Sequence, residues 1–200
     1  MDFNSECRSC QRLYHYRQRL THQYPNYHNR PVPASGDPQA RLIIVGLAPG
    51  LHGANASGIP FTGDQSGTLL FATLEKFGFA KDSKLMGCRI TNAVKCVPPE
   101  NRPTGREINL CNRYLKSELQ PLQGSVILIA LGGIAHNAIL KSFHLIQRDF
   151  KFAHLAEHQI KPEIKMLDSY HCSRYNVQTG RLTIAMFDAV FQRATKLISG

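Results

Sequence analysis

The loop after the first apolar run carries side chains with clear chemical potential. The run over residues 42–45 ends in Gly46-Leu47-Ala48-Pro49-Gly50, and Phe61-Thr62-Gly63-Asp64 follows at the start of an amphipathic segment. One aromatic ring and one carboxylate are thereby placed beside a turn of small residues. Because ligands of open α/β sheets bind at the carboxyl ends of the strands, we expect this loop to form the floor of a pocket.

Six cysteines are the second chemical signal. The spacing of Cys7 and Cys10 lets two thiolates converge on one metal centre from a single turn, and Cys96 and Cys111 could complete a four-cysteine shell. From the residue types alone, zinc and an iron–sulfur cluster fit this shell comparably well. Cys96 and Cys111 as ordinary buried thiols remain the alternative. We assign Cys88 to packing at the start of a strand.

Charge and hydropathy narrow the class of protein. The chain has 200 residues, with 24 Lys and Arg against 14 Asp and Glu, and the excess positive charge favours a polyanionic partner. No apolar stretch reaches the roughly 18 residues that span a membrane. The first residues are acidic and polar, so we expect a cytoplasmic protein whose cysteines form no disulfides.

Four short runs rich in β-branched residues predict strands, with segments of helical periodicity between them. This alternation favours a mostly parallel sheet covered on both faces, so we expect a three-layer α/β/α sandwich with a central four-stranded parallel sheet. We predict a single domain over residues 1–200, in which residues 1–40 form an N-terminal extension that carries two of the metal ligands. The predicted strands are 42–45, 89–94, 126–131 and 164–167, and the helical stripes lie within 69–77, 108–119, 134–143 and 182–198.

Several motifs, in their residues and in their order along the chain, resemble those of one known family, the iron–sulfur uracil-DNA glycosylases. The resemblance is closest to the family 5 branch. Leu47 is the apolar form typical of family 5, whereas family 4 enzymes usually carry an acidic residue there. Cys172 stands where the third motif of the family usually has Pro. The motifs that carry the resemblance are Gly46-Leu47-Ala48-Pro49-Gly50, Gly53-Ala54-Asn55, Phe61-Thr62-Gly63-Asp64, Thr91-Asn92-Ala93-Val94-Lys95-Cys96 with Pro98-Pro99 and Asn101-Arg102, and Tyr170-His171-Cys172-Ser173-Arg174-Tyr175-Asn176 with Thr179-Gly180-Arg181-Leu182-Thr183.

The resemblance implies a DNA-repair hydrolase that cleaves the N-glycosidic bond of uracil, or of other deaminated bases, and leaves an abasic site. It implies a structural [4Fe-4S] cluster on Cys7, Cys10, Cys96 and Cys111, which shifts the choice from zinc to iron. The partner would be DNA, from which the enzyme must extrude the damaged nucleotide at a cost of a few kcal/mol. We expect a monomer associated with the nucleoid.

Four residues receive roles in this reaction from their motif positions and their chemistry. Phe61 would stack on the uracil ring, and the Asn92 carboxamide would donate to O4 and accept from N3–H, a pattern that cytosine reverses. His171 would stabilise the negative charge that develops on the departing base, by donating to O2. Asp64 would orient or activate the attacking water, or else only cap the following helix.

Two further groups surround these residues. Leu47 and Ala48 would line the pocket. Arg174, Tyr175 and Asn176, in the loop after the histidine motif, would contact DNA, with Tyr175 entering the space left by the flipped base and Arg174 holding a phosphate.

The sequence leaves open the role of one basic segment and two other functions. Arg8, Arg12, Arg17 and Arg19 form either a DNA-facing stripe or a solvated helix face. A non-catalytic nucleic-acid-binding protein with a structural or redox-sensing four-cysteine metal centre would show the same charge and cysteines. An α/β hydrolase or nucleotide-binding enzyme that uses the glycine-rich loop for phosphate is the weaker interpretation, because the loop lacks both the P-loop lysine and the glycine spacing of a dinucleotide fingerprint.

Overall fold

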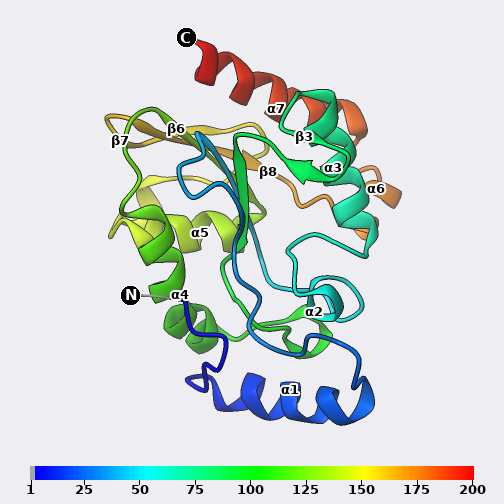
Figure 1. Cartoon of the computed structure of the whole chain (residues 1–200). Helices are drawn as coiled ribbons and strands as arrows, with labels where there is room; N and C mark the ends of the chain where they lie inside the picture. The colour runs from blue at the N-terminus through cyan, green and yellow to red at the C-terminus, as the bar shows by residue number, and fades with distance from the viewer. Residues whose placement is uncertain (1–2) are drawn as a thin grey trace.

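A six-stranded sheet forms the centre of the computed structural model, which describes residues 3–200 (Figure 1). The strand order is β1-β5-β2-β6-β8-β7. The four central strands are parallel and coincide with the four runs predicted from the sequence, which confirms the four-stranded parallel core. They are β5 (Cys88–Asn92), β2 (Leu42–Gly46), β6 (Val126–Leu131) and β8 (Ile164–Ser169).

Two edge strands extend the sheet beyond the four that the sequence predicts. β1 (Ser35–Gly36) pairs with β5 and β7 (Glu157–Lys161) pairs with β8, both antiparallel. A separate hairpin joins β3 (Ala80–Lys81) to β4 (Lys84–Leu85). None of these four additional strands contains an apolar run, since β1, β3 and β4 have two residues each and β7 is mostly polar. Edge strands need only one buried face, so hydrophobic runs do not reveal them.

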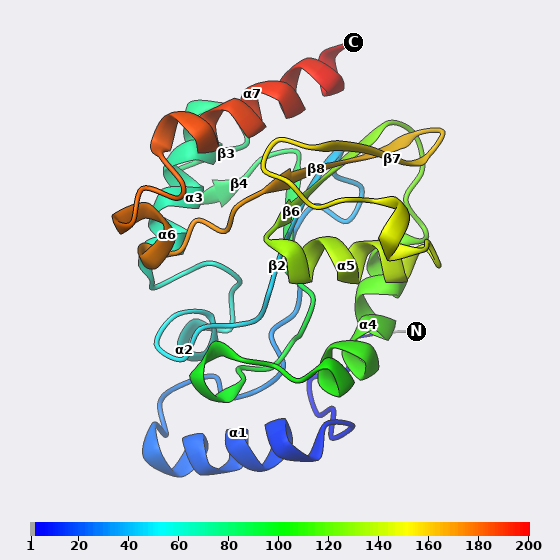
Figure 2. The same cartoon turned by 180° about the vertical axis from the view of Figure 1, so that it is seen from behind.

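Helices cover both faces of the sheet, which confirms the three-layer sandwich (Figure 2). α3 (Gln65–Lys76) and α7 (Ile184–Ser199) pack on one face, and α4 (Gly105–Leu119) and α5 (Gly133–Ser142) pack on the other. The alternation along β2 shows the division. Leu42 and Ile44 belong to the core with α3 and α7, whereas Ile43 and Val45 belong to the core with α4 and α5.

The N-terminal segment forms α1 (Gln11–Gln23), which lies at one end of the molecule, far from α7 (Figures 1 and 2). Two of the four arginines in its basic stripe hold it in place. Arg17 is buried and donates to the backbone oxygens of Cys7 and Asn29, and Arg12 pairs with Glu107 of α4 at 2.7 Å. The stripe is therefore not a continuous DNA-facing surface, because these two side chains are used to dock the helix.

Short helical turns complete the chain. They are α2 (Ala54–Ser57), α6 (Arg174–Gln178) and the 3-10 turns η1 (Pro99–Asn101) and η2 (Gln147–Asp149). Within residues 3–200, no helix combines the length and the apolar character needed to cross a bilayer.

Candidate functional site

A cavity of about 320 Å³ opens where β2, β5 and β8 end. Its walls bring together six residues that the sequence places far apart, as expected for the switch region of a parallel sheet. The six are all the residues that we predicted to bind the base or to take part in the reaction: Leu47, Ala48, Phe61, Asp64, Asn92 and His171.

Gly46 leaves space for two of these side chains, Asn92 and Phe61. It ends β2 directly opposite Asn92 in the parallel register. A Cβ on Gly46 would lie 2.5 Å from Asn92 Oδ1 and 2.7 Å from two ring carbons of Phe61. Asn92 is only 3% exposed, yet its side chain makes no hydrogen bond to any residue within 3–200. A buried carboxamide at the cavity wall is thus available to a ligand.

Phe61 is held in a strained backbone conformation. Its φ is +56°, a left-handed value that is costly for a bulky residue and that clusters at functional sites. The backbone of α3 approaches closely at this point, since a Cβ on Gly67 would lie 2.0 Å from the Phe61 carbonyl oxygen. The ring lies nearly parallel to the imidazole of His171, with centroids 6.0 Å apart and planes at 25°.

His171 follows β8 and presents an imidazole with unused hydrogen-bonding capacity. Its Nδ1 is buried and has no partner in the described part of the chain. Burial lowers the pKa of His171, and the nearby Asp64 carboxylate opposes this shift only in part. The ring is therefore neutral at neutral pH and can donate one N–H to a ligand.

The loop after His171 is held in place by a hydrogen bond from one of its own side chains. Asn176 Nδ2 donates to the His171 carbonyl oxygen at 2.8 Å, so this side chain turns inward rather than toward solvent. Arg174 and Tyr175 lie on the exposed side of α6, and Tyr175 is 70% exposed. The three residues predicted as a DNA-contact group therefore divide: two face outward, and Asn176 supports the histidine.

The two carboxylate oxygens of Asp64 have different surroundings. Its Oδ1 accepts a hydrogen bond from the Gly67 N–H at 2.9 Å, which caps α3. Its Oδ2 faces the pocket loop, where a Cβ on Gly50 or Gly53 would lie 3.2 Å or 2.7 Å from it. One carboxylate oxygen thus stabilises the helix while the other borders the cavity.

The cavity also has lining residues that we did not predict. Asn101 reaches it from η1, where Glu100 and Asn101 have φ values of +54° and +55°. The sequence signal was the turn around Pro98-Pro99, but a turn alone does not indicate which side chain faces a pocket. The remaining unpredicted residues are Gly50, Ala54, Ser66 and Ser173.

A second, narrower cavity is lined by Cys7, Cys10, Cys96 and Cys111, so the four predicted metal ligands converge. Two nitrogen donors point at their sulfurs. The Lys95 backbone N–H lies 3.2 Å from Cys111 Sγ. Arg113 Nη2 lies 3.3 Å from Cys7 Sγ. Hydrogen bonds to sulfur are one means by which proteins tune thiolate-bound metal centres, so the donor set fits such a group.

The free thiols of this cavity differ in acidity. Burial alone would raise the pKa of Cys7, but hydrogen bonds with Tyr114, Ser9 and Arg113 lower it to about 7. Burial raises the pKa of Cys96 to about 12 and that of Cys111 to about 11. A bound metal would have to displace the protons of the two buried thiols.

Cys88 and Cys172 lie apart from the four-cysteine cavity. Both are buried in the core between the sheet, α3 and α7. Cys88 Sγ donates to the Phe79 carbonyl oxygen, which agrees with the packing role that we assigned to it.

Comparisons with known proteins agree on one family. A family model described as the uracil DNA glycosylase superfamily matches residues 33–195. A type-5 uracil-DNA glycosylase of Thermus thermophilus is 41% identical, over 96% of this chain and 93% of its own length. The Mycobacterium leprae type-5 enzyme is 39% identical, over 96% and 92%. A type-4 enzyme of Archaeoglobus fulgidus is 36% identical over only 57% of this chain and 54% of its own. The chain therefore belongs to the uracil DNA glycosylase superfamily and, within it, to the type-5 family.

Proposed function

We propose that this protein excises uracil from DNA by hydrolysing the N-glycosidic bond, which leaves an abasic site. The observation that carries the proposal is the convergence of Phe61, Asn92 and His171, from three distant parts of the chain, on one cavity of about 320 Å³. Relatives that share nearly the full length of this chain are named uracil-DNA glycosylases.

Base recognition uses the cavity walls. The Phe61 ring stacks on the extruded base, an interaction worth about 1–3 kcal/mol. The free Asn92 carboxamide, buried at the wall, pairs with uracil O4 and N3–H, and cytosine presents the opposite pattern at these two atoms. Leu47 and Ala48 complete the apolar lining. Outside the cavity, the exposed Tyr175 fills the gap in the duplex and Arg174 holds a phosphate.

Bond cleavage uses two residues, one acting on the departing base and the other on the water that attacks the sugar. As the glycosidic bond lengthens, negative charge grows on the base, and the neutral imidazole of His171 donates a hydrogen bond to uracil O2. The sugar acquires positive charge, and the Asp64 oxygen that borders the cavity orients the attacking water. Stabilisation of the leaving group is the larger contribution, because donors aimed at developing charge often dominate catalysis.

We further propose that Cys7, Cys10, Cys96 and Cys111 hold a [4Fe-4S] cluster. When bound, the cluster supplies a structural cross-link between the segment before α1, the end of β5, and α4. The N–H donors from Lys95 and Arg113 then stabilise the anionic sulfurs. A brown anaerobic preparation with iron and sulfide in equal amounts supports this assignment. A colourless preparation with stoichiometric zinc would refute it.

We also propose that residues 1–200 act as one domain and as a monomer in the cytoplasm, at the nucleoid. The single-domain assignment is supported by the continuous sheet that both helical layers share and by the side-chain contacts that dock α1. Light scattering at micromolar concentration tests the monomer, and a dimer mass would contradict it.

The assay that decides the function uses a labelled U:G duplex, followed by alkali to cleave abasic sites. We expect strand cleavage by the wild-type protein, with His171→Ala and Phe61→Ala strongly reduced. If the wild-type protein gives no more product than His171→Ala, the glycosylase proposal fails. Salt-sensitive duplex binding without cleavage, unaffected by Phe61→Ala, would instead support the non-catalytic binding protein.

A further inference from the structure

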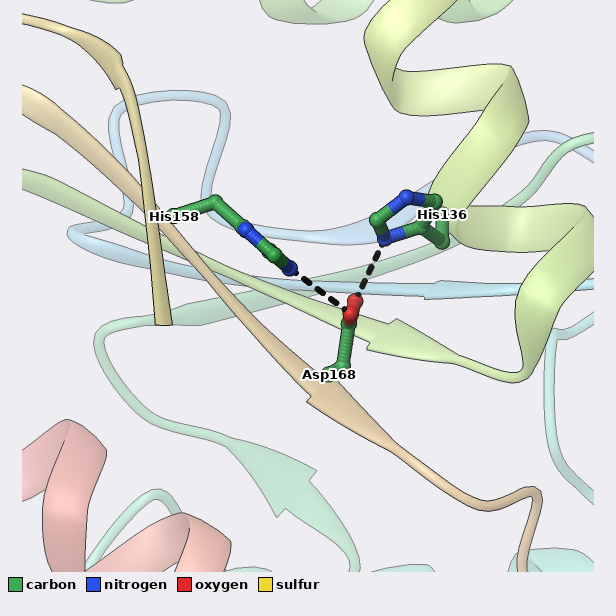
Figure 3. A group of neighbouring side chains, drawn as sticks. All are labelled: His136, His158 and Asp168. Carbon is green, nitrogen blue, oxygen red and sulfur yellow. Dashed lines mark hydrogen bonds and ion pairs between the residues drawn. The ribbon is translucent and has the colours of Figure 1, made fainter. Parts of the chain in front are cut away.

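Two histidines and one carboxylate, none of which lines the base pocket, lie next to one another (Figure 3). His136 comes from α5, His158 from β7 and Asp168 from β8. The side chains of His136 and Asp168 are 1% and 0% exposed, and that of His158 is 12% exposed. None of the three has a role in the proposed reaction.

The hydrogen bonds of His136 leave a lone pair directed at the carboxylate. Its Nε2 lies 3.0 Å from the carbonyl oxygen of Phe150, which can only accept, so Nε2 carries a proton. In the neutral ring, Nδ1 is then a bare acceptor, 2.8 Å from Asp168 Oδ1. Two acceptors at this distance require either a proton between them, carried by His136 or by Asp168, or a metal ion.

The second histidine completes a set of ligand atoms. His158 Nε2 lies 2.9 Å from Asp168 Oδ2, and one ligand atom from each of the three residues lies within 4.8 Å of the others. With metal–ligand bonds of about 2.0–2.2 Å, a separation of about 2.9 Å between two ligand atoms corresponds to a bond angle near 90°, so each histidine–carboxylate pair would open by about half an ångström to reach the tetrahedral angle that zinc prefers. Two imidazoles and one carboxylate are a common ligand set for first-row divalent ions.

The surroundings have the features of a second coordination sphere. The Phe150 carbonyl fixes the tautomer and orientation of His136, as carbonyls commonly do for metal-bound histidines. The rings of Phe152 and Phe150 pack edge-on against His136 and His158, with centroids 5.7 Å and 5.8 Å apart, and shield the site. The partial exposure of His158 gives an ion and a water ligand a route of entry.

We propose that His136, His158 and Asp168 bind one divalent transition-metal ion, for which Zn²⁺ is the probe, at a site separate from the four cysteines. The ion would replace the proton shared by His136 and Asp168 and would cross-link α5, β7 and β8. Asp168 precedes His171 by a few residues, so the cross-link would stiffen the strand end that carries the proposed catalytic imidazole. This inference does not depend on the glycosylase proposal.

The test uses the protein with its native cysteine-bound metal in place, treated with a mild chelator and then dialysed against Zn²⁺. We expect the wild-type protein to hold one more equivalent of zinc than His158→Gln and Asp168→Asn. We also expect zinc to raise the Tm of the wild-type protein by about 5 °C, and not that of the variants. His22→Gln, which removes an exposed imidazole on α1, should behave as wild type.

Zinc bound by the cysteines cannot mimic this result, because the variants keep all four. Equal zinc content and equal Tm shifts in wild type and His158→Gln overturn the proposal. A second measurement covers the case in which a variant fails to fold. If the imidazole ¹⁵N spectrum of the zinc-treated wild-type protein shows both nitrogens of His136 still protonated, the cluster is a hydrogen-bonded ion pair and the proposal is wrong.

Discussion

Gly46 and Asn92 lie side by side at the ends of β2 and β5, and the Asn92 amide oxygen occupies space next to the bare Cα of Gly46. The Phe61 ring approaches the same Cα. Both the proposed base reader and the proposed stacking ring therefore depend on the absence of a side chain at Gly46.

Replacing Gly46 by Ala tests this relationship. The new Cβ would stand 2.5 Å from Asn92 Oδ1 and 2.7 Å from Phe61, so both side chains must move. Since a displacement of about 1 Å can lower a rate by about 100-fold, we expect uracil excision to fall by about that factor. Overpacking should lower the free energy of unfolding by about 1–3 kcal/mol. Gly105→Ala is the matched control, because a Cβ at Gly105 meets nothing within 4 Å. Normal excision by Gly46→Ala would show that the pocket tolerates the shift.

Asp64 variants separate helix capping from catalysis. Asp64→Asn keeps the acceptor for the Gly67 N–H but loses the charge, so we expect unchanged stability with excision reduced about 100-fold or more. Asp64→Ala should lose the same activity and also about 1 kcal/mol of stability. Urea unfolding and single-turnover excision measure the two effects. If Asp64→Asn retains full activity, the carboxylate is a cap alone.

The pH dependence of stability reports on His171. Burial lowers its pKa in the folded chain, and it also lowers the pKa of His154. An unfolded chain, in which histidine has a pKa of about 6.5, binds these protons more readily. The contribution of these two histidines to the free energy of unfolding is thus fully present above about pH 6.5. This contribution is lost as the pH falls through the lower pKa values of the folded chain.

We therefore expect the urea midpoint to decrease between about pH 7.5 and pH 5.5, and the decrease to be smaller in His171→Asn. His22→Gln, at an exposed position, should keep the wild-type dependence. An identical slope in His171→Asn and wild type would contradict the neutral buried imidazole.

Tyr175 should matter for duplex DNA and not for folding. Tyr175 is 70% exposed on α6, so Tyr175→Ala should change the free energy of unfolding by less than about 0.5 kcal/mol. Loss of a ring that occupies the emptied stack should weaken binding to a U:G duplex about tenfold, and binding to a single strand much less. Fluorescence anisotropy measures both, with Gln178→Ala on the same helix as control. Equal losses on both substrates would argue against insertion into the duplex.

Periodicity in the sequence was enough to predict the central sheet and the four long helices around it. Residues 42–45 alternate between two helical layers and are therefore all apolar, and such runs mark strands buried on both faces. The edge strands β1 and β7 were not predicted, because each is partly exposed to solvent and neither contains a hydrophobic run.

The sequence by itself determined the chemical inventory: the small-residue loop after residue 45, the four cysteines, and the order of Phe61, Asp64, Asn92 and His171 along the chain. Only the tertiary structure decided which side chains share a space. It brought Asn101 into the pocket, buried the Arg17 side chain of α1 and placed His136 and His158 next to Asp168. The physical reason is that these contacts join residues far apart in the chain, so they depend on how the strands and helices pack against one another. Local periodicity reports which face of each element is buried and carries no information about that packing.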